Sequence, residues 1–338
     1  MNAIILAGGE GTRLKSVTGA LPKPMAVLGG KPILAHILAL LRRCGVRRAC
    51  VTLRYRPEVI RDYFGDGRDF GLELSYHVEE TPLGTAGAVR ACRDFCAGRD
   101  VLVISGDCAC DADLRPLAEA RRRLDAAAVL GLYPQPDPLQ YGVVLTDRSR
   151  RVVGFVEKPR WGQVVSDLVN TGIYVLSPRA LDRIPEGRPF DFAKDLFPLL
   201  LAEGERLFGL PLEGYWCDIG TPRSYFQSNL DALDGKLRLE GAEESHPPEP
   251  AAAAAAEPEG AVQRALLCRS RARLMRRLSE TLMEAGADFS DGITLAGAAG
   301  KVHIAPEPDG EAVRVAADSE ALCERYARLA RELEAQET

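Results

Sequence analysis

Two short stretches decide the fold of this chain: Met1-Asn-Ala-Ile-Ile-Leu-Ala-Gly8-Gly9-Glu-Gly11-Thr12-Arg13-Leu14 and Leu21-Pro22-Lys23-Pro24-Met25. Residues 3–7 form an apolar run, which predicts a buried strand leading into a glycine-rich loop. Because glycine has no Cβ, the backbone N–H groups of such a loop can come close to phosphate oxygens. Arg13 and Lys23 then add positive charge for the same anion. The N-terminus therefore predicts a nucleotide or polyphosphate site at the end of a strand.

Two better-known phosphate-binding loops do not fit this segment. A P-loop requires G-x-x-x-x-G-K-[ST], and no such string begins at Gly8 or Gly9. The dinucleotide fingerprint G-x-G-x-x-G is also absent, because Leu14 stands where the third glycine belongs. A tight turn without a ligand is the competing interpretation of the bare glycines. Arg13 and the Pro-Lys-Pro segment weigh against it.

The composition excludes several classes of protein. A length of 338 residues allows two domains, and 46% hydrophobic with 27% charged residues is typical of a globular protein. The net charge of −5 gives no reason to expect a nucleic-acid partner. No apolar run approaches the roughly 20 residues of a membrane helix, so we expect no membrane partner.

The cysteines and the N-terminus predict a cytoplasmic protein. The nine cysteines are odd in number and contain no C-x-x-C pair, so we expect reduced thiols in the core. The chain starts directly with a strand, which predicts no secretory signal. Cys108 and Cys110 flank the end of a predicted strand, where we favour buried structural thiols over a reactive one.

Strand-like and helical patterns alternate through the first half of the chain. The predicted strands are residues 3–7, 48–53, 72–77, 101–105, 127–132 and 142–145, and the predicted helices are residues 32–44, 57–63, 85–95 and 113–124. This alternation predicts an α/β fold with a Rossmann-like, mostly parallel sheet and helices on both faces. Ligands of such sheets bind at the carboxyl ends of the strands, where Gly8 and Asp107 are expected.

The rest of the chain predicts a linker and a small second domain. Residues 1–235 form the predicted first domain, and residues 236–261 the linker, which contains Pro-Pro-Glu-Pro and six consecutive alanines. Residues 262–338 predict a small α+β domain with a helix over 262–285, strands at 291–296, 301–305 and 312–316, and a last helix from Asp318-Ser319 to about 334. The basic stretch at 264–277 permits a nucleic-acid interpretation, but a solvated helix face is favoured at this net charge.

Six further short sequence motifs follow the N-terminal loop and make its functional interpretation more specific. They are Glu80-Thr-Pro-Leu-Gly84-Thr-Ala-Gly87, Ser105-Gly106-Asp107, Tyr141-Gly142, Glu157-Lys158-Pro159, Asn170-Thr171-Gly172 and Trp216-Cys-Asp218-Ile-Gly220. With the opening loop, their order resembles the sugar-1-phosphate nucleotidyltransferases over residues 1–235, and most of all the mannose-1-phosphate guanylyltransferases. Residues 62–67 and 190–198 resemble the same subgroup.

The resemblance implies an activity, a metal and a set of site residues. These enzymes join a sugar 1-phosphate to a nucleoside triphosphate and release pyrophosphate, so both small molecules are the expected partners. The implied catalytic residues are Arg13 and Lys23, and the implied Mg²⁺ ligands are Asp107 and Asp218. The implied nucleotide-binding residues are Leu6, Ala7, Gly8, Gly9, Gly11, Thr12, Glu80 and Gly84. The implied sugar-phosphate-binding residues are Gly142, Glu157, Lys158, Asn170 and Thr171.

Each residue also has an ordinary structural interpretation. Arg13 or the Glu157-Lys158 pair can be surface charges, and Asp107 can cap a turn after its strand. For Asp218 the functional interpretation rests largely on the match to its motif.

Several functions stay open at this point. The leading hypothesis is synthesis of GDP-mannose from GTP and mannose 1-phosphate. A UTP/glucose 1-phosphate or GTP/heptose 1-phosphate enzyme, or a non-catalytic sensor of nucleotide sugars, remains an alternative, and a homo-oligomer is left open. Residues 262–338 also resemble the last domain of phosphomannomutases. Residues 305–310 lack the arginine and serine of that family's phosphate loop, so mutase activity is not expected.

Overall fold

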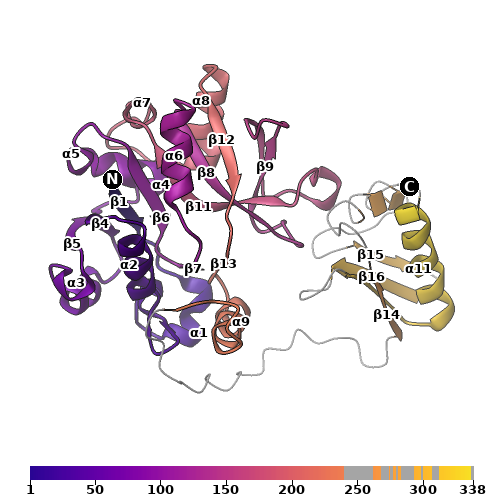
Figure 1. Ribbon diagram of the computed structural model, residues 1–338. Helices are drawn as coiled ribbons and strands as arrows, with labels where there is room; N and C mark the ends of the chain where they lie inside the picture. The colour runs from indigo at the N-terminus through magenta and orange to yellow at the C-terminus, as the bar shows by residue number, and fades with distance from the viewer. Residues whose placement is uncertain are drawn as a thin grey trace. The chain divides into compact units, whose positions relative to one another are not determined.

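The computed structural model describes residues 1–239 and, in the C-terminal part, residues 262–267, 274, 277–278, 281–282, 293–297, 300–306 and 312–335 (Figure 1). Two compact units divide the chain. The first contains residues 1–133, 146–154 and 170–250, and the second contains residues 134–145, 155–169 and 251–338. The domain boundaries expected from the sequence stay a prediction. Residues 240–261 of the expected linker lie outside the described residues.

A mostly parallel sheet lies at the centre of the fold, as the alternation of elements predicts. β1 (Asn2–Leu6) lies between β4 (Arg48–Leu53) and β6 (Val101–Ser105) and runs parallel to both. β5 (Glu73–Val78) continues the parallel order beyond β4. β1, β4 and β6 are buried over almost their whole length, because strands covered on both faces bury both sets of side chains.

Strands with both antiparallel and parallel pairings complete the sheet on its other side. β11 (Leu168–Leu176) runs antiparallel to β6, which makes the sheet mixed. The strand order is β10-β9-β11-β6-β1-β4-β5, with β8 beside β11 and β12 beside β8. The bounds of these strands are β8 (Ala128–Pro134), β9 (Gly142–Thr146), β10 (Val152–Glu157) and β12 (Leu207–Pro211).

Helices pack against the sheet (Figure 1), and α2 (Ile33–Arg43) shows why they form. Pro32 precedes its first turn, and Ile33, Ile37 and Leu41 are buried at helical spacing. The expected single helix over residues 85–95 is wrong, because the chain breaks at Cys92 into α4 and α5. The other helices are α1 (Lys15–Thr18), α3 (Pro57–Phe64), α4 (Gly84–Ala91), α5 (Arg93–Cys96), α6 (Arg115–Arg123), α7 (Pro178–Leu181), α8 (Phe197–Ala202) and α9 (Pro222–Leu233).

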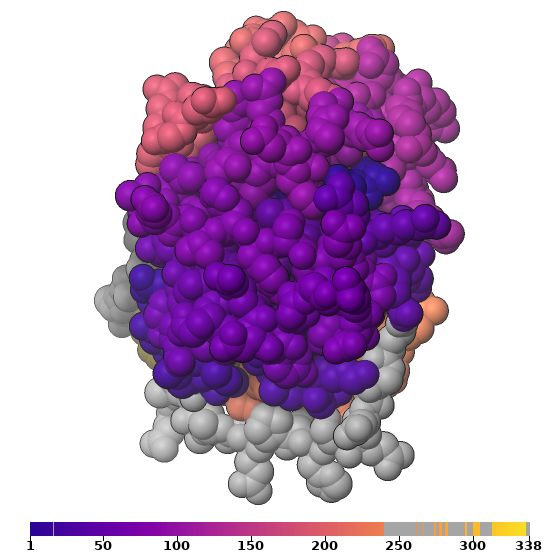
Figure 2. All heavy atoms as spheres, turned by 90° about the vertical axis from the view of Figure 1, so that its left-hand side faces the viewer, coloured from indigo at the N-terminus to yellow at the C-terminus, as the bar shows by residue number. Residues whose placement is uncertain are grey.

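Short turns and hairpins complete the N-terminal part. β2 (Val27–Leu28) pairs with β3 (Lys31–Pro32), and β7 (Cys108–Cys110) pairs with β13 (Trp216–Asp218). The single-turn helices are η1 (Thr12–Leu14), η2 (Lys23–Met25), η3 (Arg68–Phe70), η4 (Trp161–Gln163) and η5 (Phe192–Leu196). Figure 2 shows the face that the N-terminal residues, from indigo to purple, form together, with the α7–α8 region along its upper edge.

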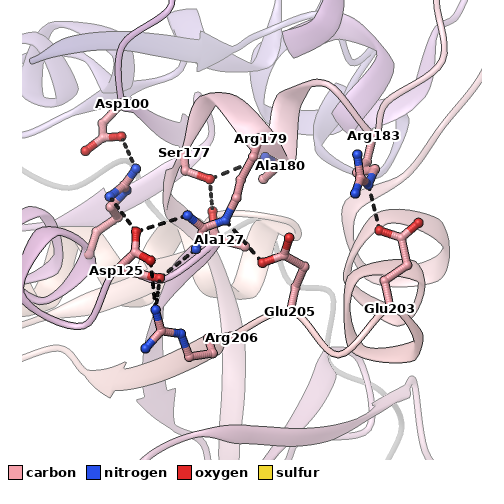
Figure 3. A network of polar contacts seen from close by, with 11 residues as sticks. Asp100, Asp125, Ala127, Ser177, Arg179, Ala180, Arg183, Glu203, Glu205 and Arg206 are labelled. Atoms are coloured by element: carbon pink, nitrogen blue, oxygen red, sulfur yellow. Dashed lines mark hydrogen bonds and ion pairs between the residues drawn. The ribbon is translucent and has the colours of Figure 1, made fainter.

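An ion-pair network joins helix α7 to two loops of the first unit (Figure 3). Asp125 lies between α6 and β8 and accepts hydrogen bonds from Arg179 at 3.0 Å and from Arg206 at 2.8 Å. The backbone oxygen of Asp125 accepts from the same two guanidinium groups. Arg179 also bonds Glu205 at 3.1 Å. The network therefore connects α7, the loop before β8 and the loop before β12, which are distant in sequence.

The second unit contains an antiparallel sheet whose strand order is β14-β17-β16-β15. The strands are β14 (Val262–Leu267), β15 (Ile293–Gly297), β16 (Gly300–Pro306) and β17 (Ala312–Ala317), and α11 (Glu320–Ala335) follows them. Val313, Val315 and Ala317 alternate into the core. Ser319 accepts a hydrogen bond from the Leu322 N–H, which confirms the expected start of the last helix.

The expected helix over residues 262–285 is wrong at its beginning. Residues 262–267 pair with β17 as a strand, and helical backbone is described only at Leu274, Arg277–Leu278 and Thr281–Leu282. Val262 and Leu266 are four residues apart, a spacing that fits one face of a helix and one face of a strand equally well. The resemblance of this region to phosphomannomutases stays a prediction. No helix among the described residues combines the length and apolarity needed to cross a membrane.

Candidate functional site

The glycine-rich loop leaves β1 at its carboxyl end and passes over the Lys23 side chain. Gly11 has φ +60, and a Cβ there would lie 2.7 Å from the Cβ of Lys23. A Cβ on Gly8 would lie 3.0 Å from a carboxylate oxygen of Glu79. At Gly9, by contrast, a Cβ would meet no described atom within 4 Å. Two glycines are therefore needed for packing within the protein, and the third faces open space that a ligand can enter.

Lys23 lies between two carboxylates that come from distant parts of the chain. Its Nζ is 2.6 Å from Asp107 Oδ2 and 3.5 Å from Asp218 Oδ1. The Lys23 residue is only 8% exposed, which is rare for a lysine unless it is paired. Ser105 donates a hydrogen bond of 2.7 Å to the other oxygen of Asp107. The structure thus brings together three of the residues expected at the site and adds Ser105.

The pairing of β7 with β13 brings the two carboxylates together. In this short antiparallel ladder Asp218 lies opposite Cys108, and the Ile219 N–H donates a hydrogen bond of 3.0 Å to the Asp107 carbonyl. Gly172, with φ +75, lets β11 approach the end of β6, because a Cβ there would lie 3.1 Å from Ser105 Cβ. The Asn170-Thr171-Gly172 motif therefore supports the Ser105–Asp107 hydrogen bond through its glycine.

The electrostatics of this cluster favour an additional cation. Burial acts to lower the pKa of Lys23, but Asp107 and Asp218 raise it above its ordinary value. Burial acts to raise the pKa of Asp107, yet Lys23 and Ser105 hold it below its usual range. Burial and the neighbouring Asp107 raise the pKa of Asp218. One lysine charge faces two carboxylates, so the ionised cluster is net negative and attracts a second positive group.

Arg13 is exposed and lies on the same side of the cluster as Asp218. A Cβ on Gly220 would lie 2.8 Å from Asp218 Oδ2 and 3.4 Å from the Arg13 guanidinium. The absence of a side chain at Gly220 therefore leaves room for both groups. An exposed guanidinium near the carboxylates is available to an anionic ligand, which it can hold by two parallel hydrogen bonds.

The donor set of the cluster fits a magnesium ion. No group of three or more His, Cys, Asp or Glu side chains is gathered as a metal site among the described residues. Magnesium, however, is commonly held by one or two carboxylates together with water and substrate phosphates. Asp107 and Asp218 offer hard carboxylate oxygens of this kind.

The buried carboxylate beside the glycine loop is Glu79, which the sequence reasoning missed. Glu79 is 9% exposed and accepts a hydrogen bond from the Leu83 N–H, whereas the neighbouring Glu80 is exposed. The sequence does not indicate which of the two consecutive glutamates is buried. β5 ends just before them, so the alternation of buried and exposed side chains along that strand no longer applies. The structure places Glu79, and not Glu80, against Gly8.

A neighbouring segment occupies the space beside the glycines of α4. Gly84 has φ +70, and a Cβ there would lie 2.7 Å from the Phe190 carbonyl oxygen. That oxygen accepts from the N–H groups of Ala86 and Gly87 at 2.9 and 3.0 Å. The small residues of α4 thus accommodate the chain near Phe190.

Asn170 and Thr171 point in different directions along β11. Thr171 is 3% exposed, and its hydroxyl donates a hydrogen bond of 2.7 Å to the Gly131 carbonyl. The half-buried Asn170 side chain accepts hydrogen bonds from the Tyr174 hydroxyl at 2.8 Å and from the Gly172 N–H at 3.1 Å. The Thr171 hydroxyl proton is therefore engaged within the sheet, while the Asn170 amide group keeps its N–H donors.

Gly142, Glu157 and Lys158 belong to the second unit. Gly142 is buried at the start of β9, and Glu157 and Lys158 are both exposed. The Lys158 backbone has φ +45, and its N–H donates a hydrogen bond of 3.0 Å to the Tyr141 carbonyl. A left-handed backbone at a residue other than glycine costs roughly 1–2 kcal/mol and is often found at functional sites.

The thiols near the cluster are buried. Cys108 is 2% exposed and Cys110 is 7% exposed. Burial raises the pKa of Cys108 well above its usual range and that of Cys110 to about 12. Thiols with these properties are inert, as expected for structural cysteines.

These features define an α/β protein with a glycine-rich loop after its first strand, whose basic and acidic side chains meet at the carboxyl ends of the strands. The chain belongs to the nucleotidyl transferase family, whose family model matches residues 2–235. It is 36% identical over 236 residues to a mannose-1-phosphate guanylyltransferase of Mycobacterium tuberculosis, and 34% identical over 251 residues to a UTP–glucose-1-phosphate uridylyltransferase of Synechocystis. Each match covers 70% of this chain, and the chain spans 65% of the length of each relative.

Solved structures agree with this family. A putative glucose-1-phosphate thymidylyltransferase from Bacillus anthracis, in complex with sucrose, superposes with a TM-score of 0.63 at 28% identity, covering 69% of this chain and 96% of that chain. HddC from Yersinia pseudotuberculosis, complexed with GMP-PN, superposes with a TM-score of 0.58 at 29% identity, covering 68% of this chain and 98% of that chain. The mixed, mostly parallel sheet is therefore the fold of nucleotidyltransferases.

Proposed function

We propose that this protein transfers a guanylyl group from GTP to mannose 1-phosphate, producing GDP-mannose and pyrophosphate. The observation that carries the proposal is the cluster in which Lys23 contacts Asp107 and Asp218 beneath the glycine-rich loop. A phosphate loop, a buried lysine and two carboxylates are the groups that phosphoryl transfer requires. The relatives at 34–36% identity support the same reaction class.

The reaction needs two anions to be brought together. An oxygen of the sugar phosphate attacks the α-phosphorus of the nucleoside triphosphate, a new P–O bond forms, and the α–β bond breaks with release of pyrophosphate. Lys23 offers its charge to the α-phosphate or the sugar phosphate, and Arg13 offers a guanidinium to the β- and γ-phosphates. No side-chain nucleophile is required, because positioning and charge neutralisation supply most of the catalysis.

Asp107 and Asp218 would hold the divalent metal. A magnesium ion held there would supply positive charge to offset the negative charge of the two phosphates. Ser105 orients Asp107 through a hydrogen bond of 2.7 Å, which leaves the Lys23-facing oxygen directed into the cluster. In the free protein Lys23 supplies the counter-charge to both carboxylates.

We infer that Glu79, which lies beside Gly8 of the loop, selects guanine as the base. Its carboxylate accepts hydrogen bonds only, and guanine offers two adjacent donors, the ring N1–H and the exocyclic amino group. Uracil and thymine offer one donor between two carbonyl oxygens, which a carboxylate repels. Glu79→Gln is therefore expected to lower the ratio of kcat/KM for GTP to that for UTP by about tenfold or more, the equivalent of one good hydrogen bond.

The experiment is pyrophosphate release with Mg²⁺ by the purified full chain. GTP, UTP, ATP, CTP and dTTP are each paired with mannose, glucose and heptose 1-phosphates. Release with GTP and mannose 1-phosphate alone is the expected result, with Asp107→Asn as the inactive control. Release with another pair would refute the substrate assignment but keep the reaction class. Binding of nucleotide sugar without any release would favour a non-catalytic sensor.

A further inference from the structure

The hydrophobic core of the second unit contains side chains from residues 155–169 as well as from the C-terminal sheet. Trp161 is 0% exposed and Val164 is 1% exposed, and both belong to one buried cluster with Leu278, Val313 and Val315. An indole of this size buries roughly 150–250 Å² of surface. Trp161 is therefore a main part of the core around which the C-terminal sheet packs.

Trp161 stands three residues after Lys158, within a turn over residues 160–164 that is closed by hydrogen bonds. The Arg160 N–H donates to the Gln163 side chain at 3.0 Å, and the Gln163 N–H donates back to the Arg160 carbonyl at 2.8 Å. The Val164 N–H donates to the Trp161 carbonyl at 3.1 Å, and Pro159 is buried. Only Pro159, whose ring fixes its φ, separates this turn from Lys158, so few rotatable bonds lie between the buried indole and the Lys158 backbone.

Lys158 requires such an anchor because its backbone is held in an unfavourable conformation. Its φ of +45 lies in the left-handed region, which lysine rarely adopts. Such a conformation persists only where the surroundings determine it. The Tyr141 carbonyl holds the Lys158 N–H on one side, at 3.0 Å, and the buried Trp161 turn holds the chain on the other.

We propose that the C-terminal residues position the sugar-phosphate motif, and that Trp161 is the positioning residue through which they act. The side chain of Lys158 is exposed and makes no ion pair with any described residue, so it is free to meet a phosphate, while its backbone is fixed by the core of the second unit. The ligand concerned is the sugar 1-phosphate, and the kinetic part of this inference rests on the proposed function. The C-terminal residues are then needed for sugar-phosphate binding and not for binding of the nucleotide.

Fluorescence tests the burial of Trp161 without any activity. The chain contains two tryptophans, so Trp216→Phe leaves Trp161 as the single tryptophan, which is excited selectively at wavelengths that tyrosine does not absorb. We expect blue-shifted emission that acrylamide quenches weakly, shifting to the red only when the second unit unfolds in urea. Emission typical of exposed tryptophan in the folded protein would overturn the proposal.

Kinetics of the full chain test the positioning role. Trp161→Ala is expected to raise KM for the sugar 1-phosphate by about tenfold or more, which corresponds to about 1.4 kcal/mol, and to leave KM for the nucleoside triphosphate within about twofold. Trp161→Phe, which keeps an aromatic side chain in the core, is expected to restore most of the affinity. Phe64→Leu in α3 of the first unit is the matched control for loss of a buried aromatic ring, and it should not change the two KM values selectively.

Equal changes in both KM values for Trp161→Ala, or none, would refute positioning while the proposed function stands. If the wild-type chain turns over no substrate pair, titration calorimetry with mannose 1-phosphate replaces kinetics, and Trp161→Ala must still weaken that binding. A wild-type chain that neither reacts with nor binds a sugar 1-phosphate would remove the proposed function and this inference together.

Discussion

Lys23→Met removes the cation that lies between the two carboxylates, and its effect on stability follows from the burial of the cluster. The Lys23 side chain is 10% exposed, and the side chains of Asp107 and Asp218 are each 31% exposed. Breaking a fully buried ion pair costs about 3–5 kcal/mol, whereas an exposed pair contributes about 0–1 kcal/mol. The partly buried cluster falls between these limits, so we expect a loss of about 2 kcal/mol of unfolding free energy.

The assay is urea unfolding at pH 7 in the absence of divalent metal, followed by circular dichroism. At a slope of about 2 kcal/mol per molar urea, the loss lowers the midpoint by about 1 M. Lys236→Met is the matched control, because Lys236 also faces two carboxylates, Asp231 and Asp234, but its side chain is 62% exposed. That variant should leave the midpoint nearly unchanged.

Two further measurements separate charge from packing. Lys23→Met combined with Asp107→Asn is expected to recover part of the loss, because the uncompensated carboxylate is gone. Millimolar Mg²⁺ should stabilise Lys23→Met more than the wild-type protein, since the metal then binds without competition from the lysine. This account of the cluster would be refuted if Lys23→Met had the urea midpoint of the wild-type protein. It would also be refuted if the double variant were less stable than Lys23→Met and Mg²⁺ stabilised Lys23→Met no more than the wild-type protein.

Two more predictions concern packing and the ion-pair network. Gly84→Ala forces a Cβ to within 2.7 Å of the Phe190 carbonyl at φ +70, so it should destabilise by about 1–3 kcal/mol more than Gly98→Ala, which has φ +67 and no described atom within 4 Å. Equal urea midpoints for the two variants would contradict this. Hydrogen bonds from Arg179 lower the pKa of Asp125, so the stabilisation it provides is present above its ordinary value of 3.8 and is lost as the pH falls below that value. Asp125→Asn should therefore lower the thermal midpoint at pH 7 in low salt, and the difference from wild type should shrink at high salt and below about pH 4; a difference independent of both would exclude the charge network as its cause.

The strands of the sheet could be predicted because their signal is local. The predicted strands at 48–53 and 101–105 coincide with β4 and β6. Both consist mostly of buried apolar residues, and a sheet buried on both faces accepts few other sequences. Where the local pattern was ambiguous, the prediction failed. The spacing of Val262 and Leu266 fits a helix or a strand, and this segment forms a strand because it pairs with β17.

The candidate site was predicted through motifs, and its geometry was not. Lys23, Asp107 and Asp218 belong to three separate sequence motifs, and each motif predicted its own residue without indicating that the three lie together. That the lysine lies between the two carboxylates depends on the pairing of β7 with β13, whose residues are more than 100 positions apart in the chain. The choice of Glu79 over Glu80 likewise depends on which glutamate the packed loop turns inward.

The sequence by itself determined the alternation of strands and helices, the glycine loop after the first strand and the lysine between two prolines. These features follow from local chemistry, because side-chain size, the missing Cβ of glycine and the ring of proline restrict the backbone wherever they occur. Only the tertiary structure decided that Lys23 meets Asp107 and Asp218, and that Trp161 belongs to the core of the C-terminal sheet. Contacts of this kind depend on how distant segments pack, and packing is a property of the whole folded chain, which no local pattern encodes.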